Sequence, residues 1–567
     1  MKNKNNSHTA AIFNTMHSSI IKKYLLSTLL LMMACIVPAL AQKKDKKLET
    51  ENVDIVRDYK PKILDAAKIE VLPEAEKLEV KKPSMSYTTP FYLFPTATYK
   101  STFRTLQITK TEQEPLQHAW VKAGFGNYSN IYLEGFVNTT YRKDAAFTAQ
   151  AKYNSGNGPL ANGQFMNALI DLSGKKIFGK NIVSGGLNFK DDMYHFYRYN
   201  HDTTRNVDPN KIKQNFTDIN VNAAFEHAMA DTGQLKYKLG VAFYTFHDNF
   251  KANENDLTIT GRAIEPFHTN SIIFDAGFDY MAYKFIKTIN RNIVNINVNY
   301  KFDLDGLRGY AGFKTSTETN DSSSTFHFYP NLYIEGDLSE KALVGFLGLT
   351  GGLQKNTFKS FATENPFVQS GLDLRNTNNK LKVFVGLKGG IGSNGFYLVS
   401  LSYELYKNMY FYVNDTADTK RFLTWYDDNT KVLNIHAEGG MLFNTKFSMN
   451  AIINYYSYAL NNPLIQKPFH KPGLELGLGA NYKIENKIVL GTNIFVMDKR
   501  YALLSNGKDI TTLKPVFDLN LNGTYKHSET LAFFVELNNL LNQQYQVWNN
   551  YPVRGIMVMG GVKINFW

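Results

Sequence analysis

The feature that most constrains this chain is an alternation of apolar and polar residues, sustained from about residue 117 to the C-terminus. In residues 294–302, Val, Ile, Val, Tyr and Phe alternate with Asn and Lys, and residues 474–483 and 517–526 repeat the pattern. Successive side chains of a β-strand point to opposite faces, so each segment predicts a strand with one apolar and one polar face. Asn, Asp and Glu are disfavoured inside strands unless their face is wet. We therefore expect water on one side of the sheet.

The links between the alternating segments differ in length in a regular way. Tight polar turns are predicted near residues 142–144, 178–181, 231–233, 290–292, 338–340, 393–395, 444–446, 484–486 and 527–529. Longer loops are predicted at about residues 194–212, 251–266, 304–322, 354–378, 413–429, 461–470 and 501–513. Short turns on one side and long loops on the other are typical of outer-membrane barrels, whose turns face the periplasm.

These two features predict an all-β fold, a transmembrane antiparallel β-barrel over residues 117–567. At roughly ten residues per crossing we expect about 20 strands, with a range of 18–22, and residues 354–378 have room for a further pair. The mean hydropathy of −0.31 fits a barrel, because only one face of each strand must be apolar. Composition alone leaves open a secreted, soluble all-β enzyme or adhesin.

Residues 1–41 have the pattern of an export signal. Lys22 and Lys23 precede an apolar run over residues 24–37, and the small residues of 39–41 predict cleavage between Ala41 and Gln42. The only cysteine of the chain lies inside this segment, so the mature protein has no disulfide, which a large barrel does not need. We expect the mature protein in the outer membrane.

Residues 42–116 differ from the rest of the chain. Residues 43–82 are dense in charges of both signs, and prolines recur from Pro61 to Pro95 at a spacing that excludes long helices. We predict an extended, proline-rich and charge-rich periplasmic segment that can enter the lumen near residues 91–94. Removing the four lysines of residues 1–41 lowers the formal charge from +13 to +9. Without a basic tract, nucleic acid is not an expected partner, whereas outer-membrane lipid is.

The C-terminal end carries the most specific motif. Residues 539–545 read Asn-Leu-Leu-Asn-x-x-Tyr, residues 551–555 read Tyr-Pro-x-x-Gly, and the last strand alternates up to Phe566. A chain that stops on such a strand suggests a closed barrel, in which the last strand pairs with the first. This end resembles that of the TonB-dependent outer-membrane receptors, particularly those of the Bacteroidetes. The resemblance implies a receptor-like or porin-like barrel for solute binding and passage.

The N-terminal region departs from that family. Its members carry a plug domain considerably larger than residues 42–116, and no such domain is evident in this sequence. Val53, Ile55 and Val56 lie where the family has a short strand that contacts TonB, and an extended peptide there can add to the edge of a partner's sheet; an ordinary edge strand has the same pattern. The alternative function is therefore a plugless accessory or assembly subunit of an envelope complex, bound to a periplasmic or envelope protein through residues 42–116.

Two aromatic groups at external strand ends are candidate ligand contacts, because aromatic rings with Arg suit sugars, peptides and flat chelates. The alternative is an outer aromatic girdle that continues into its loops. The first group lies within residues 194–201, and the second comprises residues 406–412 with side chains across the following loop. The candidate contacts are Tyr194, His195, Tyr197, Arg198, Tyr199, Arg421, Trp425 and Tyr426.

The sequence contains no constellation typical of an enzyme. There is no His-Glu-x-x-His, no Cys pair, no Gly-x-Ser-x-Gly and no phosphate loop. His436 and Glu438 share the polar face of one strand and suit a metal or acid–base site, but lumen lining explains them more simply. Carboxylates within residues 415–428 suit Ca²⁺, but a solvated loop is the simpler interpretation. We expect no enzymatic activity, no cofactor and no bound metal.

Overall fold

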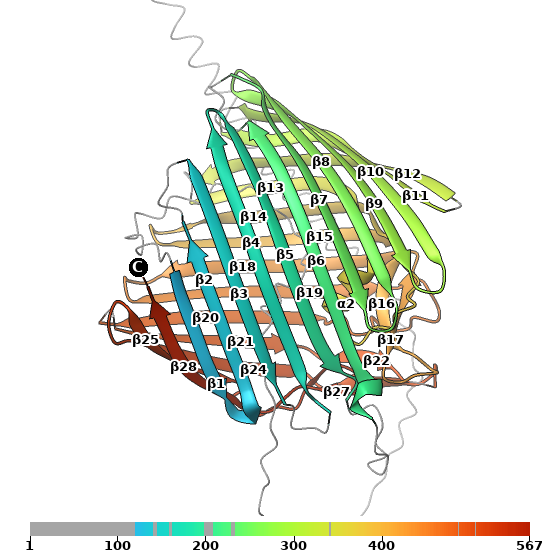
Figure 1. Cartoon of the computed structure of the whole chain (residues 1–567). Coiled ribbons are helices and arrows are strands. Elements are labelled where there is room, and N and C mark those ends of the chain that lie inside the picture. Colours follow the sequence, from blue (N-terminus) through green and yellow to red (C-terminus); the bar gives the residue numbers. More distant parts are fainter. Residues whose placement is uncertain are drawn as a thin grey trace, which may run out of the picture. The chain divides into compact units, whose positions relative to one another are not determined.

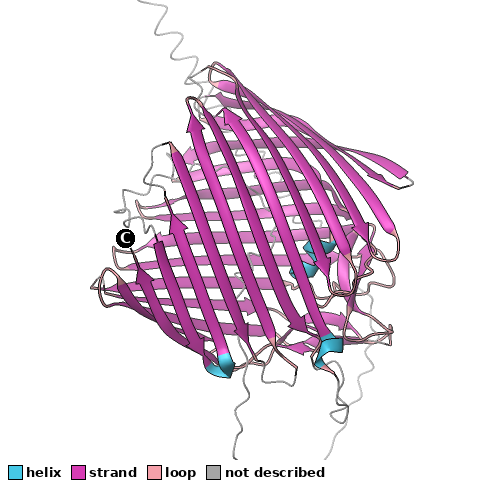
Figure 2. Ribbon diagram, viewed as in Figure 1, coloured by secondary structure: helices cyan, strands magenta, loops and turns pink. Residues whose placement is uncertain are grey.

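The computed structural model describes residues 119–139, 144–157, 162–197, 208–227, 233–304, 306–321, 323–339, 342–485, 487–504 and 506–566. In these ranges 22 antiparallel strands form one sheet that closes on itself (Figures 1 and 2). This confirms the predicted all-β, antiparallel barrel. The expected signal peptide and the segment 42–116 lie outside the described residues, and their boundaries remain predictions.

We call the 22-strand sheet the wall, and its first half comprises eleven strands. In chain order these are β1 (Ala119–Gly126), β2 (Asn130–Asn138), β3 (Ala145–Gly156), β4 (Phe165–Phe178), β5 (Asn181–His195), β6 (Lys213–His227), β7 (Lys236–Asp248), β8 (Asn253–Phe267), β9 (Asn270–Lys284), β10 (Thr288–Leu304) and β11 (Leu307–Asn320). The second half comprises β12 (Ser323–Ser339), β13 (Leu343–Gln354), β14 (Thr377–Ile391), β15 (Gly395–Lys407), β18 (Thr430–Leu442), β19 (Phe447–Ala459), β20 (Leu474–Ile484), β21 (Ile488–Met497), β24 (Val516–Lys526), β25 (Leu531–Asn538) and β28 (Met557–Asn565).

The barrel closes between its first and last strands, as the C-terminal alternation predicts. β1 pairs with β28 in antiparallel register from Trp120 opposite Asn565 to Gly126 opposite Met559. On the outer side Val558, Ile564 and Phe566 are exposed, whereas Met557 and Met559 on the other face are buried. A closed ladder leaves no free sheet edge, so every wall strand finds its backbone partners within the wall.

The 22 strands lie at the upper limit of the predicted range, because two segments predicted as loops are strands. β8 occupies most of residues 251–266, and β11 occupies most of residues 304–322. We call the end of the barrel that carries the long connections, such as those after β5, β13 and β15, the loop end. Near the loop end both strands carry polar residues on the outer face as well, such as Asn255 in β8 and Thr317 in β11. The alternation that identifies a strand is therefore lost there, although the backbone ladder continues.

Two further local predictions are wrong. The predicted turn at residues 290–292 lies inside β10, and the chain turns instead at residues 285–287. The polar run Asn-Arg-Asn resembles a turn, but its central Arg291 is a buried side chain on the inner face. Residues 354–378 do not add a strand pair to the barrel; they contain a short helix, α2 (Phe358–Glu364).

The two faces of the wall follow the predicted alternation. Val294, Ile296 and Tyr300 of β10 are exposed on the outer side, whereas Asn299 on the opposite face is buried. Tyr482 and Tyr525 are exposed beside tight turns, where an interfacial aromatic girdle is expected. The outer face of the wall is therefore suited to lipid, and its inner face is polar.

The remaining elements lie in connections at the loop end. They are the hairpins β16 (Met409–Asn414) with β17 (Phe422–Asp427), β22 (Arg500–Leu503) with β23 (Ile510–Leu513), and β26 (Gln546–Trp548) with β27 (Tyr551–Pro552), and the 3₁₀ turns η1 (Asn127–Ser129) and η2 (Pro209–Ile212). In the part of the chain that the structure describes, no helix has the length and apolarity needed to cross a membrane.

Candidate functional site

Five connections pack together at the loop end of the barrel, and we call them the cap: residues 355–376, 408–429, 460–473, 498–515 and 539–556. Figure 1 shows α2, β16 and β17 of the cap close together at that end of the barrel. Two clusters of buried apolar side chains hold the cap together, and the first of them joins it to the inner faces of wall strands such as β6, β7 and β9.

The strand β16 lies between the two clusters and is buried on both faces. Tyr410 and Tyr412 pack into one cluster with β17 and α2, and Phe411 and Val413 pack into the other with residues 460–473. A short continuous apolar run is the pattern of a strand buried on both faces. The run Met-Tyr-Phe-Tyr-Val at residues 409–413 therefore carried a signal of the cap that the sequence prediction did not use.

Aromatic contacts connect loops from distant parts of the chain. Phe367 stacks on Tyr551 with a ring centroid distance of 3.6 Å. The edge of Tyr197 meets the same Tyr551 ring at 5.2 Å, and the Tyr197 hydroxyl donates a hydrogen bond of 3.2 Å to the carbonyl oxygen of Pro552. Three loops meet at this point, those that follow β5, β13 and β25.

The two predicted ligand groups meet in the cap, although the sequence placed them in separate loops. The guanidinium carbon of Arg421 lies 4.2 Å from the ring centroid of Phe250 and 5.2 Å from that of Phe196, next to Tyr197. Tyr426 is buried and its hydroxyl donates a 2.7 Å hydrogen bond to the carbonyl oxygen of Asp373.

The other candidate contacts are also part of the cap or its border. Trp425 packs against the second apolar cluster, and Tyr194 packs against the first. His195 is buried, with Nδ1 at 2.9 Å from the carbonyl oxygen of Gln164. Arg198 and Tyr199 lie outside the described residues. Contact of these side chains with a ligand remains a prediction, and the structure adds that His195 and Tyr426 are buried and that the other four described candidates are half-buried.

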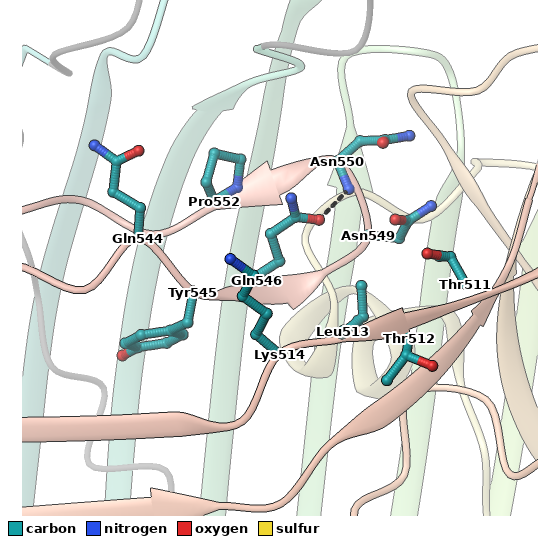
Figure 3. Close-up of a pocket in the computed structure, with 10 residues that line it drawn as sticks. All are labelled: Thr511, Thr512, Leu513, Lys514, Gln544, Tyr545, Gln546, Asn549, Asn550 and Pro552. Carbon is teal, nitrogen blue, oxygen red and sulfur yellow. Dashed lines mark hydrogen bonds between the residues drawn. The ribbon is translucent and has the colours of Figure 1, made fainter. Parts of the chain in front are cut away.

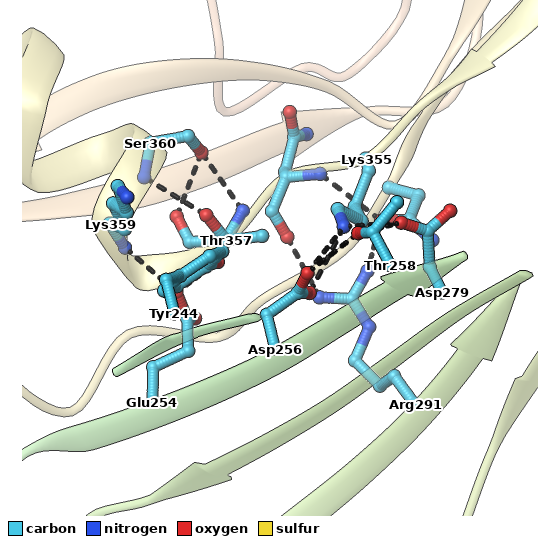
Figure 4. A network of polar contacts seen from close by, with 12 residues as sticks. Tyr244, Glu254, Asp256, Thr258, Asp279, Arg291, Lys355, Thr357, Lys359 and Ser360 are labelled. Atoms are coloured by element: carbon cyan, nitrogen blue, oxygen red, sulfur yellow. Dashed lines mark hydrogen bonds and ion pairs between the residues drawn. The ribbon is translucent and has the colours of Figure 1, made fainter. Parts of the chain in front are cut away.

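Residues 355–376, which we call the strap, run from β13 across the inner side of the loop end. Lys355 Nζ lies 2.7 Å from Asp279 of β9 and 3.0 Å from Asp256 of β8 (Figure 4). Lys359 Nζ lies 2.8 Å from Asp218 of β6. The three carboxylates point inward, since outer-face neighbours such as Ile259 are exposed. The strap is therefore tied to the inner wall by ion pairs.

Backbone groups of the strap are tied to the same wall. The fully buried Glu254 of β8 accepts hydrogen bonds from the amides of Phe358, at 2.7 Å, and Lys359, at 3.1 Å. Arg291 of β10 donates to the carbonyl oxygen of Asn356 at 2.9 Å and to the side-chain oxygen of Asn376. The polar stretches Asn-Glu-Asn-Asp at residues 253–256 and Asn-Arg-Asn at 290–292, which indicate a loop and a turn, are thus wall residues that hold the strap.

The first turn of α2 is specified locally. Thr357 accepts a hydrogen bond of 3.0 Å from the Ser360 amide, and the Ser360 hydroxyl accepts one of 2.9 Å from the Thr357 amide. This reciprocal pair is a capping box, which satisfies two of the backbone donors that a helix start leaves free. The helix places Phe358 and Phe361 in the apolar cluster and leaves the amides of its first turn facing Glu254.

The cap connects opposite sides of the barrel. β10, which holds both ends of the strap through Arg291, and β25, which leads into Tyr551, stand eleven places apart in the 22-strand ring. The strap carries Phe367, which stacks on Tyr551. A continuous chain of contacts therefore spans the ring at its loop end.

Two pockets border the β22–β23 hairpin of the cap. The pocket in Figure 3, of about 350 Å³, is lined by Thr511, Thr512, Leu513, Lys514, Gln544, Tyr545, Gln546, Asn549, Asn550 and Pro552. The other, of about 470 Å³, is lined by residues 458, 460–463, 465–468 and 501. Amides, hydroxyls and lysines dominate both linings, and neither contains a carboxylate. These pockets suit polar groups rather than a large apolar ligand.

His470 is a buried, neutral link between three parts of the cap. Its Nδ1 lies 2.9 Å from the carbonyl oxygen of Tyr412 and therefore carries the proton, and its Nε2 accepts from the amide of Asn549 at 3.3 Å. Burial, with a smaller contribution from the nearby charges of Arg500 and Lys471, lowers the pKa of His470 to about 3. The ring thus joins β16 to the β26–β27 hairpin in its neutral form.

The groups suggested for metal or acid–base chemistry have structural partners. His436 and Glu438 share the inner face with 3.7 Å between His436 Nε2 and the carboxylate, while Nδ1 lies 2.7 Å from the side-chain oxygen of Asn454. Asp427, expected in a solvated loop, is fully buried and accepts backbone hydrogen bonds from Asn461 and Asn462. Within the described ranges, no group of three or more His, Cys, Asp or Glu side chains is placed to hold a metal ion.

No protein-family model and no curated protein sequence matches this chain. Its structure is similar to the pyoverdine outer membrane receptor FpvA of Pseudomonas aeruginosa, with 12% identity and a TM-score of 0.61 over 80% of this chain and 79% of that one. It is also similar to the FrpB iron transporter of Neisseria meningitidis, with 9% identity and a TM-score of 0.63 over 80% and 82% of the two chains. The ferric-catecholate import receptor Fiu of E. coli gives 9% identity and a TM-score of 0.59 over 80% and 82%.

At these identities the likeness is one of fold. The chain has a closed 22-strand antiparallel barrel similar in fold to these outer-membrane receptors and transporters, which is the barrel fold that the C-terminal motif predicts. The exposed apolar outer face and the closed ladder locate it in the outer membrane. The bacterial group suggested by the C-terminal motif remains a prediction.

Proposed function

We propose that this protein is an outer-membrane receptor for a solute that enters the barrel from the loop end, and that the cap controls its passage. The observation that carries the proposal is a closed 22-strand barrel whose loop end is spanned by a packed, aromatic cap. The likeness in fold to receptors and transporters for iron chelates supports it.

The arrangement favours a gated receptor over an open porin. In a porin the lumen is a water-filled channel. Here the Phe367–Tyr551 stack and the anchored strap join opposite sides of the ring at the loop end. A solute that reaches Arg421, Tyr197 or Tyr426 must therefore displace cap residues. The predicted ligand contacts thus become accessible when the cap opens.

The proposed role is not enzymatic. The receptors and transporters of similar fold move solutes, and titratable groups of the inner wall such as Glu335, Lys388 and Glu404 take part in ion pairs and hydrogen bonds. The inner wall is thus better suited to lining a passage than to carrying out a reaction.

The second candidate function is an accessory or assembly subunit of an envelope complex. It is favoured by the length of residues 42–116, which is short for a plug domain and leaves little for an energy-transducing partner to move. In that role residues 42–116, including Val53, Ile55 and Val56, bind a periplasmic or envelope protein, and the barrel serves as a membrane anchor.

Electrical conductance in planar lipid bilayers separates these functions. The full chain is compared with a variant in which residues 408–429 are replaced by a short Gly-Ser linker. The receptor proposal expects little conductance from the full chain and a steady pore from the variant. A steady pore in the full chain indicates a porin. The accessory role is supported if neither the full chain nor the variant forms a pore and the full chain is recovered in a stable envelope complex after mild detergent extraction. This result contradicts the receptor proposal.

A further inference from the structure

The strap is bound to a part of the wall far from its own ends. It starts after β13, yet Lys359 pairs with Asp218 of β6, seven places away in the ring. Phe358 packs there against three inward rings, those of Phe216, Phe246 and Tyr283, at centroid distances of 6.2, 5.5 and 5.5 Å. The strap therefore crosses the inner side of the loop end and docks on β6–β9.

Five inward carboxylates at this dock have partners in the strap; Asp248 accepts from the Ser370 hydroxyl, and the other four bind lysines or backbone amides. Asp256 and Asp279 flank the ammonium group of Lys355, Asp218 pairs with Lys359, and Glu254 accepts two strap amides. The Thr258 hydroxyl lies between Asp256, at 3.0 Å, and Asp279, at 2.8 Å, and can donate its one proton to either carboxylate. With the strap removed, this wall presents these five acidic groups to the lumen.

The wall does not need the strap for its own backbone bonds. β6, β7, β8 and β9 pair with one another along almost their whole length, from Phe216 opposite Asp248 to Phe267 opposite Asn270. The strap contributes side-chain and amide contacts to the inner face only. Docked and released states of the strap therefore share one wall, which is the requirement for a two-state element within a rigid barrel.

We propose that the strap is a latch: its docking on Asp218, Glu254, Asp256 and Asp279 closes the loop end, and its release opens a cation-favouring entrance lined by these carboxylates. The latch rests on the proposed receptor function and specifies how that function is regulated. Its ionic contacts are the natural point of control, because losing one partner of a buried ion pair leaves the other charge uncompensated. A ligand that carries ammonium or other cationic groups competes with Lys355 and Lys359 for the same carboxylates.

Hydrogen exchange on the full chain in detergent tests the docking. Lys359→Asp opposes Asp218 and is expected to raise amide exchange within residues 355–376 by roughly tenfold or more, while β6–β9 stay protected. The charge-swapped double variant Asp218→Lys with Lys359→Asp restores the pair and is expected to return exchange close to that of the parent. A heat-dependent shift in SDS electrophoresis confirms that each variant retains the barrel.

A matched control breaks another ion pair on the same inner wall. Arg262 of β8 bonds to Asp275 of β9, with Nη2 at 3.2 Å from the carboxylate, and the pair lies toward the turn after Phe267, away from the dock. Arg262→Met is expected to leave exchange in residues 355–376 unchanged. Equal exchange in Lys359→Asp and the parent, or the same increase in Arg262→Met, overturns the latch.

Bilayer conductance tests the consequence of release. The double variant Lys355→Met with Lys359→Met is expected to conduct several-fold more than the parent and to prefer K⁺ over Cl⁻ in reversal-potential measurements, because charged rings set the selectivity of a pore. Adding Asp256→Asn should reduce that preference. A released strap without a gain in conductance overturns its closing role, and conductance without cation preference overturns the acidic entrance.

The latch and the receptor function fail in different ways. If Lys359→Asp releases the strap and the charge swap restores it, but the protein is recovered as a subunit of an envelope complex with no passage of ions in any variant, then the receptor proposal fails while the docking remains. If the Gly-Ser variant of residues 408–429 conducts but strap exchange does not respond to Lys359→Asp, the passage remains and the latch fails.

Discussion

The wall and the cap of this molecule are built by different means. Each wall strand is antiparallel to its neighbours in a closed ladder with register shifts only between β12 and β15, and its side chains alternate between lipid and lumen. The cap has three short hairpins and one short helix, and its contacts join residues that are remote in sequence, such as Tyr197 with Pro552 or Phe367 with Tyr551. Local pattern determines the wall, whereas the meeting of loops determines the cap.

This difference has a thermodynamic side. A strand can leave the wall only by breaking its backbone hydrogen bonds to both neighbouring strands. The bilayer core has no water to replace these hydrogen bonds, so the wall behaves as one unit. The cap lies at the loop end and is held by aromatic packing, ion pairs and individual hydrogen bonds. Each of these contacts can break separately. We therefore expect changes in the cap to alter local opening and changes in the wall to alter folding of the whole barrel.

The largest local effect is expected at the centre of the cap. Phe358 is fully buried among Phe216, Phe246 and Tyr283. Phe358→Ala removes this packing and should lower the free energy of cap opening by about 3–5 kcal/mol. Hydrogen exchange in residues 355–376 measures it, and Phe326→Ala on the outer face, where the side chain is 63% exposed, is the control. A loss of barrel folding equal to the loss of cap protection would contradict the separation of cap from wall.

The wall should respond to charge on one face only. Leu519 lies on the outer face beside the exposed Phe517, and the next residue, Asn520, lies on the inner face. Leu519→Arg should cost roughly 2–4 kcal/mol of barrel stability, because the charge meets the bilayer midplane, while Asn520→Arg should be tolerated. Leu476→Arg and Asn297→Arg form a second pair with the same expectation. Folding into lipid vesicles followed by urea titration measures both, and equal costs on the two faces would argue against a lipid-facing wall.

Acid should loosen the cap before it affects the wall. The folded-state pKa of His470 is about 3 and lies below the ordinary value of 6.5, so its contribution to stability is complete above pH 6.5 and is lost as the pH falls toward 3. Between pH 7 and pH 5 the cost to the cap is about 2 kcal/mol, since each pKa unit corresponds to 1.36 kcal/mol.

Hydrogen exchange of residues 460–473 at the two pH values measures this effect. His470→Asn keeps a donor for the Tyr412 carbonyl but does not titrate, so its exchange should show a smaller difference between pH 7 and pH 5. The same pH difference in parent and variant would assign the effect to another group.

The smallest effect is expected at the start of α2. Thr357→Ala removes the side chain that accepts from the Ser360 amide and should lower strap stability by about 1 kcal/mol. Thr357→Ser keeps the capping box and should be nearly neutral. Hydrogen exchange of the amides in the first turn of α2 measures this effect. If the Ala and Ser variants exchange at the same rate, then the contacts between strap and wall, and not the Thr357 side chain, specify the helix.

Much of the barrel was predictable because its signals are local. The alternation over residues 294–302, 474–483 and 517–526 identified wall strands, and the C-terminal alternation identified a strand that pairs with the first. The prediction of loops at β8 and β11 was wrong, because the outer face of both strands becomes polar near the loop end. The prediction of a turn at residues 290–292 was wrong because Arg291 is a wall residue that donates a hydrogen bond to the strap.

The candidate site was predictable only in part. The sequence singled out Tyr197, Arg421 and Tyr426 from their chemistry, and the structure brings them into one aromatic cluster with neighbours such as Phe196, Phe250 and Phe367. It did not indicate that Lys355 and Lys359 pair with Asp218, Asp256 and Asp279. Their spacing along the chain follows no period, so no motif connects them.

The sequence by itself determined a two-faced wall and its closure, because a period of two residues and the turn signals are properties of neighbouring residues. Only the tertiary structure decided which loops meet, since a ring of 22 strands places β5, β13 and β25 within reach of one another although they are far apart in the chain. The cap and its strap exist because the closed wall holds their ends in place. An isolated loop of the same sequence lacks the inner-wall carboxylates and rings against which it packs.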